Sequence, residues 1–143
     1  MSEYFDANLF IPQLSAKSKL DALEKITSHI RQYRDIPDDF LDYIIRREQL
    51  MSTSFNEEVA FPHPSELITN ETFACVAILE NPIMWGDYKI RVVFLVSIEK
   101  TREKNLKEFY MALSRIMNNR ENIRRLVNDP TYLTFMEILK RVN

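Results

Sequence analysis

The chain has 143 residues, of which 45% are hydrophobic and 28% are charged, and its formal net charge is -2 at pH 7. This length and composition fit one globular domain with a sizeable core and exclude disorder, so we expect a single domain over residues 1–143. The single cysteine, Cys75, excludes a disulfide framework and a cysteine zinc cluster. The single glycine, Gly86, excludes the glycine-rich loops that bind nucleotides.

The charge is unevenly distributed along the chain. Residues 1–99 hold nine basic and sixteen acidic side chains, whereas residues 100–143 hold ten basic and five acidic ones. Most of the later basic residues stand at helical spacing with few aromatic neighbours: Arg115, Arg120, Arg124, Arg125, Lys140 and Arg141. This pattern is typical of a solvated helix face, so we expect no direct contact with nucleic acid.

No segment predicts contact with a membrane. The longest apolar run, residues 92–96, is far shorter than the roughly 20 residues that a membrane helix needs. The N-terminus has no basic region before an apolar one, as a signal peptide would. Together with the lone cysteine, these features predict a cytoplasmic location.

The first part of the chain predicts a short strand and two helices. Residues 9–11, followed by Pro12, are typical of a brief or edge strand. Residues 18–33 carry an apolar stripe at helical spacing, and Ser18 is the expected cap of that helix. A second helix is expected over residues 37–47, with acidic residues first and basic residues last, as the helix dipole favours.

The middle of the chain predicts strands. A loop is expected at residues 52–54 and a short strand at residues 59–61. Residues 72–79 and 89–98 also read as strands, and the second is so apolar that we expect it at the centre of a sheet. Turn signals stand between them, at residues 81–82 and 85–87.

From residue 103 the helical spacing returns. One wide apolar stripe is formed by Leu106, Phe109, Tyr110, Leu113, Ile116 and Met117. A short helix is expected over residues 121–127, and a last helix that begins at residues 129–130 and buries Leu133, Met136 and Leu139. Helices, then strands, then helices predict an α/β domain in layers.

Two histidines are candidates for chemistry. His29 lies on the first predicted helix, and we interpret it as an ordinary helix residue. His63 stands between Pro62 and Pro64, which restrict the backbone, so its imidazole leaves a stiff loop in a defined direction. On composition alone His63 still reads as a loop histidine. No second histidine or cysteine lies at ligand spacing, so we expect no metal site.

A longer string surrounds His63. It has Arg-Glu at residues 47–48, Thr53 six positions after the arginine, and a small apolar run that ends in Pro62-His63. Further on, residues 81–86 read Asn-Pro-Ile-Met-Trp-Gly before the apolar strand. Over nearly the whole chain this resembles the mannitol/fructose-type (type 2) enzyme IIA domains of the bacterial phosphoenolpyruvate-dependent sugar phosphotransferase system. Because Pro64 stands where sugar-transporting members usually have glycine, the resemblance is strongest to the IIA-like C-terminal domain of antiterminator and activator regulators.

The resemblance implies an α/β fold with a central mixed sheet of about five strands and helices on both faces. It implies that His63 accepts a phosphoryl group and needs no cofactor. Arg47 would meet the phosphoryl charge with its planar guanidinium. Thr53 would either donate its hydroxyl to phosphate or hold the loop. Glu57 matches an acidic position near the site in some members, and otherwise is a solvated loop acid.

One departure from the family pattern concerns Asn105, which stands where sugar-transporting members usually carry a second histidine. Asparagine can donate a hydrogen bond to phosphate, but it cannot carry a proton. This weakens the case for a phosphocarrier that passes phosphate to an enzyme IIB. We therefore expect a regulatory domain, the C-terminal part of a longer regulator, that the histidine-containing phosphocarrier protein phosphorylates. Transfer to enzyme IIB and a pure interaction module remain the alternatives.

Overall fold

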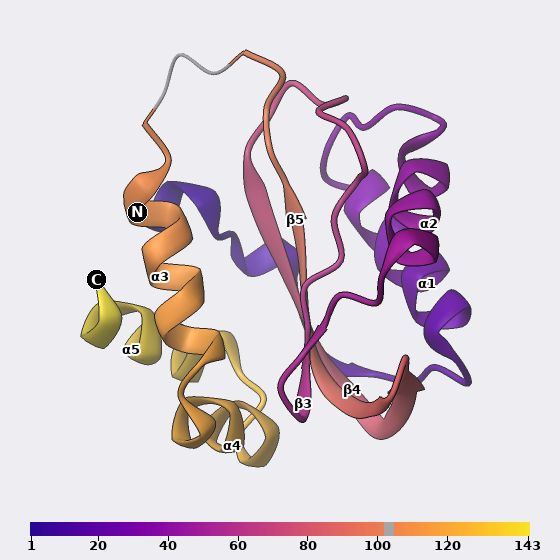
Figure 1. Cartoon of the computed structure of the whole chain (residues 1–143). Helices are drawn as coiled ribbons and strands as arrows, with labels where there is room; N and C mark the ends of the chain where they lie inside the picture. The colour runs from indigo at the N-terminus through magenta and orange to yellow at the C-terminus, as the bar shows by residue number, and fades with distance from the viewer. Residues whose placement is uncertain (102–104) are drawn as a thin grey trace.

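A five-stranded mixed sheet separates two layers of helices in the computed structural model, which describes residues 1–101 and 105–143 (Figure 1). The strands are β1 (Phe10–Leu14), β2 (Ser54–Phe55), β3 (Glu58–Ala60), β4 (Phe73–Trp85) and β5 (Tyr88–Ser97). The helices are α1 (Lys19–Arg31), α2 (Phe40–Leu50), α3 (Lys107–Met117), α4 (Arg120–Asn128) and α5 (Tyr132–Val142).

The strand order across the sheet is β1-β4-β5-β3-β2. Strands β4 and β5 form a long antiparallel hairpin, while β1 runs parallel to β4 and β3 runs parallel to β5. The apolar strand β5 therefore lies in the middle of the sheet, as its sequence predicts. Since β3 pairs with β5, the loop that follows β3 and carries His63 leaves the sheet beside this central strand.

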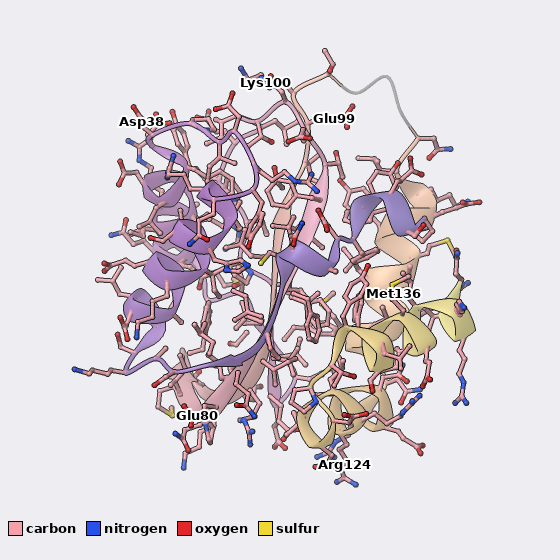
Figure 2. All side chains as sticks on the ribbon, turned by 180° about the vertical axis from the view of Figure 1, so that it is seen from behind. Asp38, Glu80, Glu99, Lys100, Arg124 and Met136 are labelled. Carbon is pink, nitrogen blue, oxygen red and sulfur yellow. The ribbon has the colours of Figure 1, made fainter. Side chains whose placement is uncertain are left out.

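The alternation of side chains along β4 and β5 builds two apolar cores. On one face of the sheet, Cys75, Leu79 and Leu95 pack with residues of α1 and α2. On the other face, Val76 and Phe94 pack with residues of α3, α4 and α5. Figure 2 shows this division from behind, with Asp38 next to α2 and Met136 of α5 on opposite sides of the sheet.

One expectation about the strands needs correction. The turn expected at residues 81–82 is wrong, because β4 continues through Pro82 to Trp85. The pairing with β5 shifts register between Ile78 and Ile83, and residues 80–82 are exposed there. A bulge accommodates a proline that has no N–H to donate. The turn at residues 85–87 is confirmed.

The helix boundaries are close to those predicted. The side chain of Ser18 accepts a hydrogen bond from the N–H of Asp21, so the cap of α1 is confirmed. Residue 103, where helical spacing begins, lies outside the described residues, and α3 begins at Lys107. None of the described helices combines the length and apolarity needed to cross a bilayer.

The last helix differs from the prediction in its cap and its buried face. Thr131, rather than Asp129, caps α5, because its side chain accepts from the N–H of Thr134. The expected burial of Leu133 is wrong, since this residue is 71% exposed. The buried face instead includes Phe135, Ile138 and Leu139.

Candidate functional site

The loop that carries His63, residues 61–65, is fixed to three other parts of the chain. Its main-chain hydrogen bonds run from Phe61 N to Thr53 O (3.1 Å), from Val96 N to Pro62 O (3.0 Å) and from Ser65 N to Tyr43 O (3.0 Å). These partners belong to the segment before β2, to β5 and to α2. With prolines on both sides of His63, such anchoring leaves the loop little conformational freedom.

The contacts of the His63 ring define its tautomer. Nδ1 lies 3.1 Å from the carbonyl oxygen of Pro64. A carbonyl oxygen can only accept a hydrogen bond, so Nδ1 carries the proton of the neutral ring and Nε2 keeps its lone pair. The ring of Phe61 stacks on the imidazole, with centroids 5.9 Å apart and an interplanar angle of 23°. The ring is therefore oriented, and Nε2 is the ring nitrogen with the free lone pair.

His63 lines a cavity of about 510 Å³ between its own loop, β5 and α3. Most of the lining is apolar, and α3 contributes Tyr110, Leu113 and Met117. Glu66 is the acidic residue of the lining. The cavity gives the half-buried imidazole a largely apolar wall on one side.

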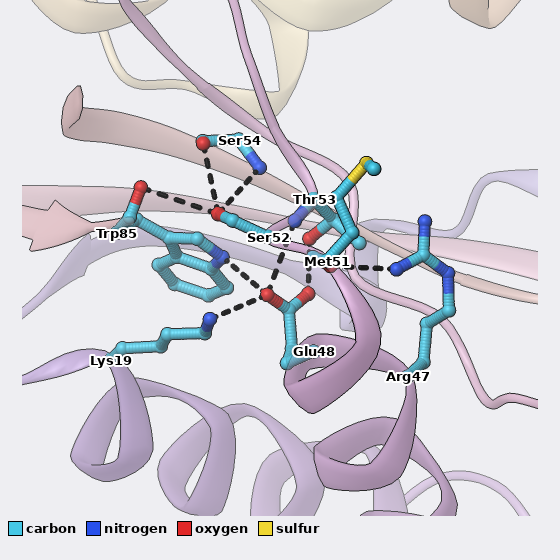
Figure 3. A network of polar contacts seen from close by, with 8 residues as sticks. All are labelled: Lys19, Arg47, Glu48, Met51, Ser52, Thr53, Ser54 and Trp85. Atoms are coloured by element: carbon cyan, nitrogen blue, oxygen red, sulfur yellow. Dashed lines mark hydrogen bonds and ion pairs between the residues drawn. The ribbon is translucent and has the colours of Figure 1, made fainter. Parts of the chain in front are cut away.

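Arg47 lies in the last turn of α2 and is half-buried. Its Nη1 donates a hydrogen bond to the carbonyl oxygen of Met51, at 2.6 Å (Figure 3). Arg47 stands one helical turn after Tyr43, whose carbonyl oxygen holds Ser65. Residues four apart share a helix face, so Arg47 and the His63 loop lie on the same side of α2. Among the described residues, no hydrogen bond joins Arg47 to His63: Arg47 donates to Met51, and Nδ1 of His63 bonds to Pro64.

Thr53 and Glu57, the two supporting candidates, have very different surroundings. Thr53 is 1% exposed, and both its N–H (3.2 Å) and its hydroxyl donate to the carboxylate of Glu48. These contacts of Thr53 fix the segment before β2 to Glu48. Glu57 is exposed in the turn between β2 and β3, where its Oε2 lies 3.6 Å from Nη2 of Arg120.

Asn105 precedes α3 and is exposed, and its Oδ1 accepts from the N–H of Lys107 at 3.0 Å. It lines a second cavity of about 560 Å³. This cavity adjoins that of His63, since Leu67, Ile98 and Tyr110 line both. The described part of the chain thus places Asn105 next to the His63 cavity but not in its wall.

Comparisons with known proteins identify the family of the chain. The model of the family "Phosphoenolpyruvate-dependent sugar phosphotransferase system, EIIA 2" matches residues 3–142. The chain belongs to this family.

Two curated relatives of this EIIA 2 chain come from Bacillus subtilis (strain 168). The "Probable licABCH operon regulator" is 25% identical over 96% of the chain, and the "Transcriptional regulator ManR" is 20% identical over 89%. The chain spans about a fifth of their lengths, 21% and 20%. The crystal structure of IIA mannitol from Escherichia coli superposes with a TM-score of 0.78 at 16% identity, over 94% of this chain and 98% of that one. The mannitol-type fold is therefore shown.

Two other reactive side chains of this EIIA 2 domain, those of His29 and Cys75, have contacts typical of structural residues. Nε2 of His29 lies 2.7 Å from the carbonyl oxygen of Asn8, on the exposed side of α1. Cys75 is fully buried, and burial raises the pKa of its thiol to about 12, so it is no nucleophile at neutral pH. The described residues contain no group of three histidine, cysteine or acidic side chains that could hold a metal ion.

Sequence reasoning missed the importance of Glu48 in this EIIA 2 domain. Glu48 is the second residue of the Arg-Glu pair, and its position in the string predicts no role for it. The structure surrounds its buried carboxylate with donors from three separate segments. The one available signal was a charged residue directly beside the predicted functional arginine.

Proposed function

We propose that His63 accepts a phosphoryl group from the histidine-containing phosphocarrier protein, and that the domain is the regulatory part of a cytoplasmic, sugar-responsive transcriptional regulator. The observation that carries the proposal is the hydrogen bond from Nδ1 of His63 to the carbonyl oxygen of Pro64. It leaves Nε2 unprotonated, on a residue that lines a cavity. Membership of the EIIA 2 family supports phosphoryl chemistry at this position.

The proposed step is a direct transfer between two imidazoles. The lone pair of His63 Nε2 attacks phosphorus, and a bond from Nε2 to phosphorus forms. The bond between phosphorus and the donor nitrogen breaks, and its electron pair stays on the imidazole of the phosphocarrier protein. Positive charge builds up on the His63 ring, and the Pro64 carbonyl that holds the Nδ1 proton stabilises it.

The charge of the moving phosphoryl group needs a fixed cation. Arg47 supplies it, since the guanidinium is planar, permanently charged and already held by Met51. Thr53 supports the loop through Glu48 rather than binding phosphate. Asn105 lines the adjoining cavity, and its side-chain amide is the donor we assign to the phosphoryl group from that side. Glu57 is a peripheral acid paired with Arg120.

A regulatory role is supported by the names of the two curated relatives, both of which are regulators. Phosphate on His63 adds about one and a half to two negative charges and strong acceptor oxygens to a surface loop beside an apolar cavity. Such a change alters which partner docks there, and regulation domains of the same longer protein are the natural partners.

Two other functions give different results in the same assays. A sugar-specific phosphocarrier would pass the phosphate from His63 to an enzyme IIB, and Asn105 in place of a histidine weakens that alternative. An interaction module would bind its partner in the same way before and after treatment with phosphoenolpyruvate, enzyme I and the phosphocarrier protein. Transfer from the phosphorylated domain to an enzyme IIB, followed by mass, separates the first alternative from the regulatory proposal.

The direct test is phosphorylation of the purified domain by phosphoenolpyruvate, enzyme I and the phosphocarrier protein, measured by intact mass. We expect one acid-labile phosphate on the wild type and on the His29→Ala control, and none on His63→Ala. Phosphate that persists in His63→Ala would show that another residue is the acceptor. A wild type that takes no phosphate would favour the interaction module.

A further inference from the structure

Glu48 forms a buried junction between parts of the chain that are distant in sequence (Figure 3). Its side chain is 4% exposed. Oε1 accepts from Nζ of Lys19 at 2.6 Å, from Nε1 of Trp85 at 3.1 Å and from the N–H of Thr53 at 3.2 Å. Oε2 accepts from the Thr53 hydroxyl. One carboxylate thus joins α1, the end of β4 and the segment that follows α2.

The segment that Glu48 holds, residues 51–54, is also bound by its other neighbours. The carbonyl oxygen of Met51 accepts from Arg47. The hydroxyl of Ser52 lies 3.4 Å from the carbonyl oxygen of Trp85 and 2.9 Å from the hydroxyl of Ser54. The segment is therefore fixed by α2 on one side and by the turn between β4 and β5 on the other.

Two further contacts lead from this segment to the candidate site. Met51 offers the carbonyl oxygen that orients the Arg47 guanidinium. Thr53 offers the carbonyl oxygen that accepts from Phe61, the first residue of the His63 loop and the ring stacked on His63. A displacement of residues 51–53 would therefore move the cation and the nucleophile at the same time.

We propose that Glu48 is a positioning residue for phosphoryl transfer: it sets the place of Arg47 through Met51 and of the His63 loop through Thr53. The inference rests on the proposed function of His63 and Arg47. A buried carboxylate is a costly way to gain stability, because its desolvation penalty is large. A buried carboxylate is, however, an effective way to fix the positions of the segments around it. Each hydrogen bond that it accepts is kept only while the carboxylate and the donor stay in place.

The first test compares phosphorylation rates of His63 with the phosphocarrier protein as donor. Glu48→Leu removes every acceptor, and we expect the rate to fall about 10-fold to 100-fold, as a displacement of about 1 Å at a reacting group can cause. Glu48→Gln keeps one oxygen and should recover much of the rate. Glu24→Gln, the same chemical change on the exposed side of α1, should match the wild type. A folded Glu48→Leu with the wild-type rate would overturn the proposal.

A purely structural role is separated from positioning by a double variant. If Glu48 acts partly through Arg47, then Glu48→Leu costs less in the Arg47→Ala background than in the wild type. The same fold-loss in both backgrounds would show that Glu48 does not act through Arg47 and would overturn that part of the proposal. If Glu48→Leu does not fold, Thr53→Val removes the hydroxyl donor alone and Thr53→Ser restores it. The rate should then fall for valine and recover for serine, and equal rates would overturn the proposal.

Two further measurements test the role of Glu48 without using the phosphocarrier protein as the phosphoryl donor. Phosphoramidate is a small phosphoryl donor that needs no docking, so slower labelling of His63 in Glu48→Leu would support positioning even if the phosphocarrier protein does not react. Hydrogen exchange at the Phe61 amide needs no phosphate at all. We expect that amide to lose protection in Glu48→Leu, or in Thr53→Val, while amides of β4 and β5 keep theirs. Unchanged protection at Phe61 would overturn the proposal whatever the donor.

Discussion

Gly86 lies so close to Ser52 that a Cβ atom on the glycine would stand 2.6 Å from the serine Oγ and 2.8 Å from its Cβ. Gly86 also has φ +65, a left-handed conformation that side chains disfavour. The only glycine of the chain is thus the point at which the turn between β4 and β5 touches the segment that follows α2.

The first prediction concerns this close approach. Gly86→Ala should lower the free energy of unfolding by at least about 1 kcal/mol, because a non-glycine residue in this region is strained. It should also lower the phosphorylation rate of His63, because Ser52 must move and Met51 is its neighbour. Urea unfolding and intact mass are the measurements. Asn56→Gly is the matched control, since Asn56 also has positive φ, at 60°, and glycine accepts it.

The second prediction separates Arg47 from its neighbour Arg46. Arg47→Ala should lower the phosphorylation rate by roughly 100-fold or more, as expected for the loss of a group that meets transition-state charge. It should cost only about 1 kcal/mol of unfolding free energy, the value of one hydrogen bond to Met51. Arg46 is exposed, with its guanidinium 4.7 Å from the Tyr43 ring, so Arg46→Ala should keep the rate. Equal rates for both variants and wild type would make Arg47 a surface charge.

The site was only partly predictable because its parts meet by folding rather than by spacing. His63, Arg47 and Thr53 could be named from one continuous string. Lys19 and Trp85 could not be connected to Glu48, since they lie on α1 and at the end of β4, and nothing local in the sequence brings them together.

The fold, too, could be predicted from the sequence only where local signals determine it. Local signals placed the helices and the central strand well, because periodicity and caps depend on near neighbours. Pro82 read as a turn because a proline lacks the N–H of a regular strand, and pairing with β5 overrides that signal through a bulge. Leu133 read as buried because it stands three residues before Met136, but Phe135, Ile138 and Leu139 put the core face on the opposite side of α5.

The third prediction concerns Cys75. Because its thiol is buried and its pKa is raised to about 12, a thiol reagent should not label the folded protein at about pH 8. Labelling should become complete in urea, with the same midpoint as the change in fluorescence of Trp85, the only tryptophan. Rapid labelling of the folded domain would show that the sheet opens locally around β4.

The fourth prediction concerns the ion pair between Asp6 and Arg34, whose atoms are 2.9 Å apart. The N–H of Asn8 and then Arg34 lower the pKa of Asp6 below its ordinary value of 3.8, against some desolvation. A lowered folded-state pKa contributes stability above the ordinary pKa, and this is lost as the pH falls through the folded value. Asp6→Asn should thus be less stable than wild type near neutral pH, and the difference should vanish below the folded pKa. A constant difference at all pH values in urea unfolding would contradict this.

The last prediction concerns Asn105, which lines the cavity next to that of His63. A histidine at this position titrates between about pH 5 and 8 and, when protonated, places a cation near the phosphoryl group. Asn105→His should therefore leave His63 open to phosphorylation but give the phosphorylated form a lifetime whose pH dependence in that range exceeds that of wild type. Asn105→Ser is the control, because a serine hydroxyl can still accept from the N–H of Lys107 but does not titrate in this range. The decay of phosphoprotein with time at several pH values measures both variants. Decay curves that coincide for histidine, serine and wild type would mean that the two cavities act separately and that residue 105 has no part in the chemistry of His63.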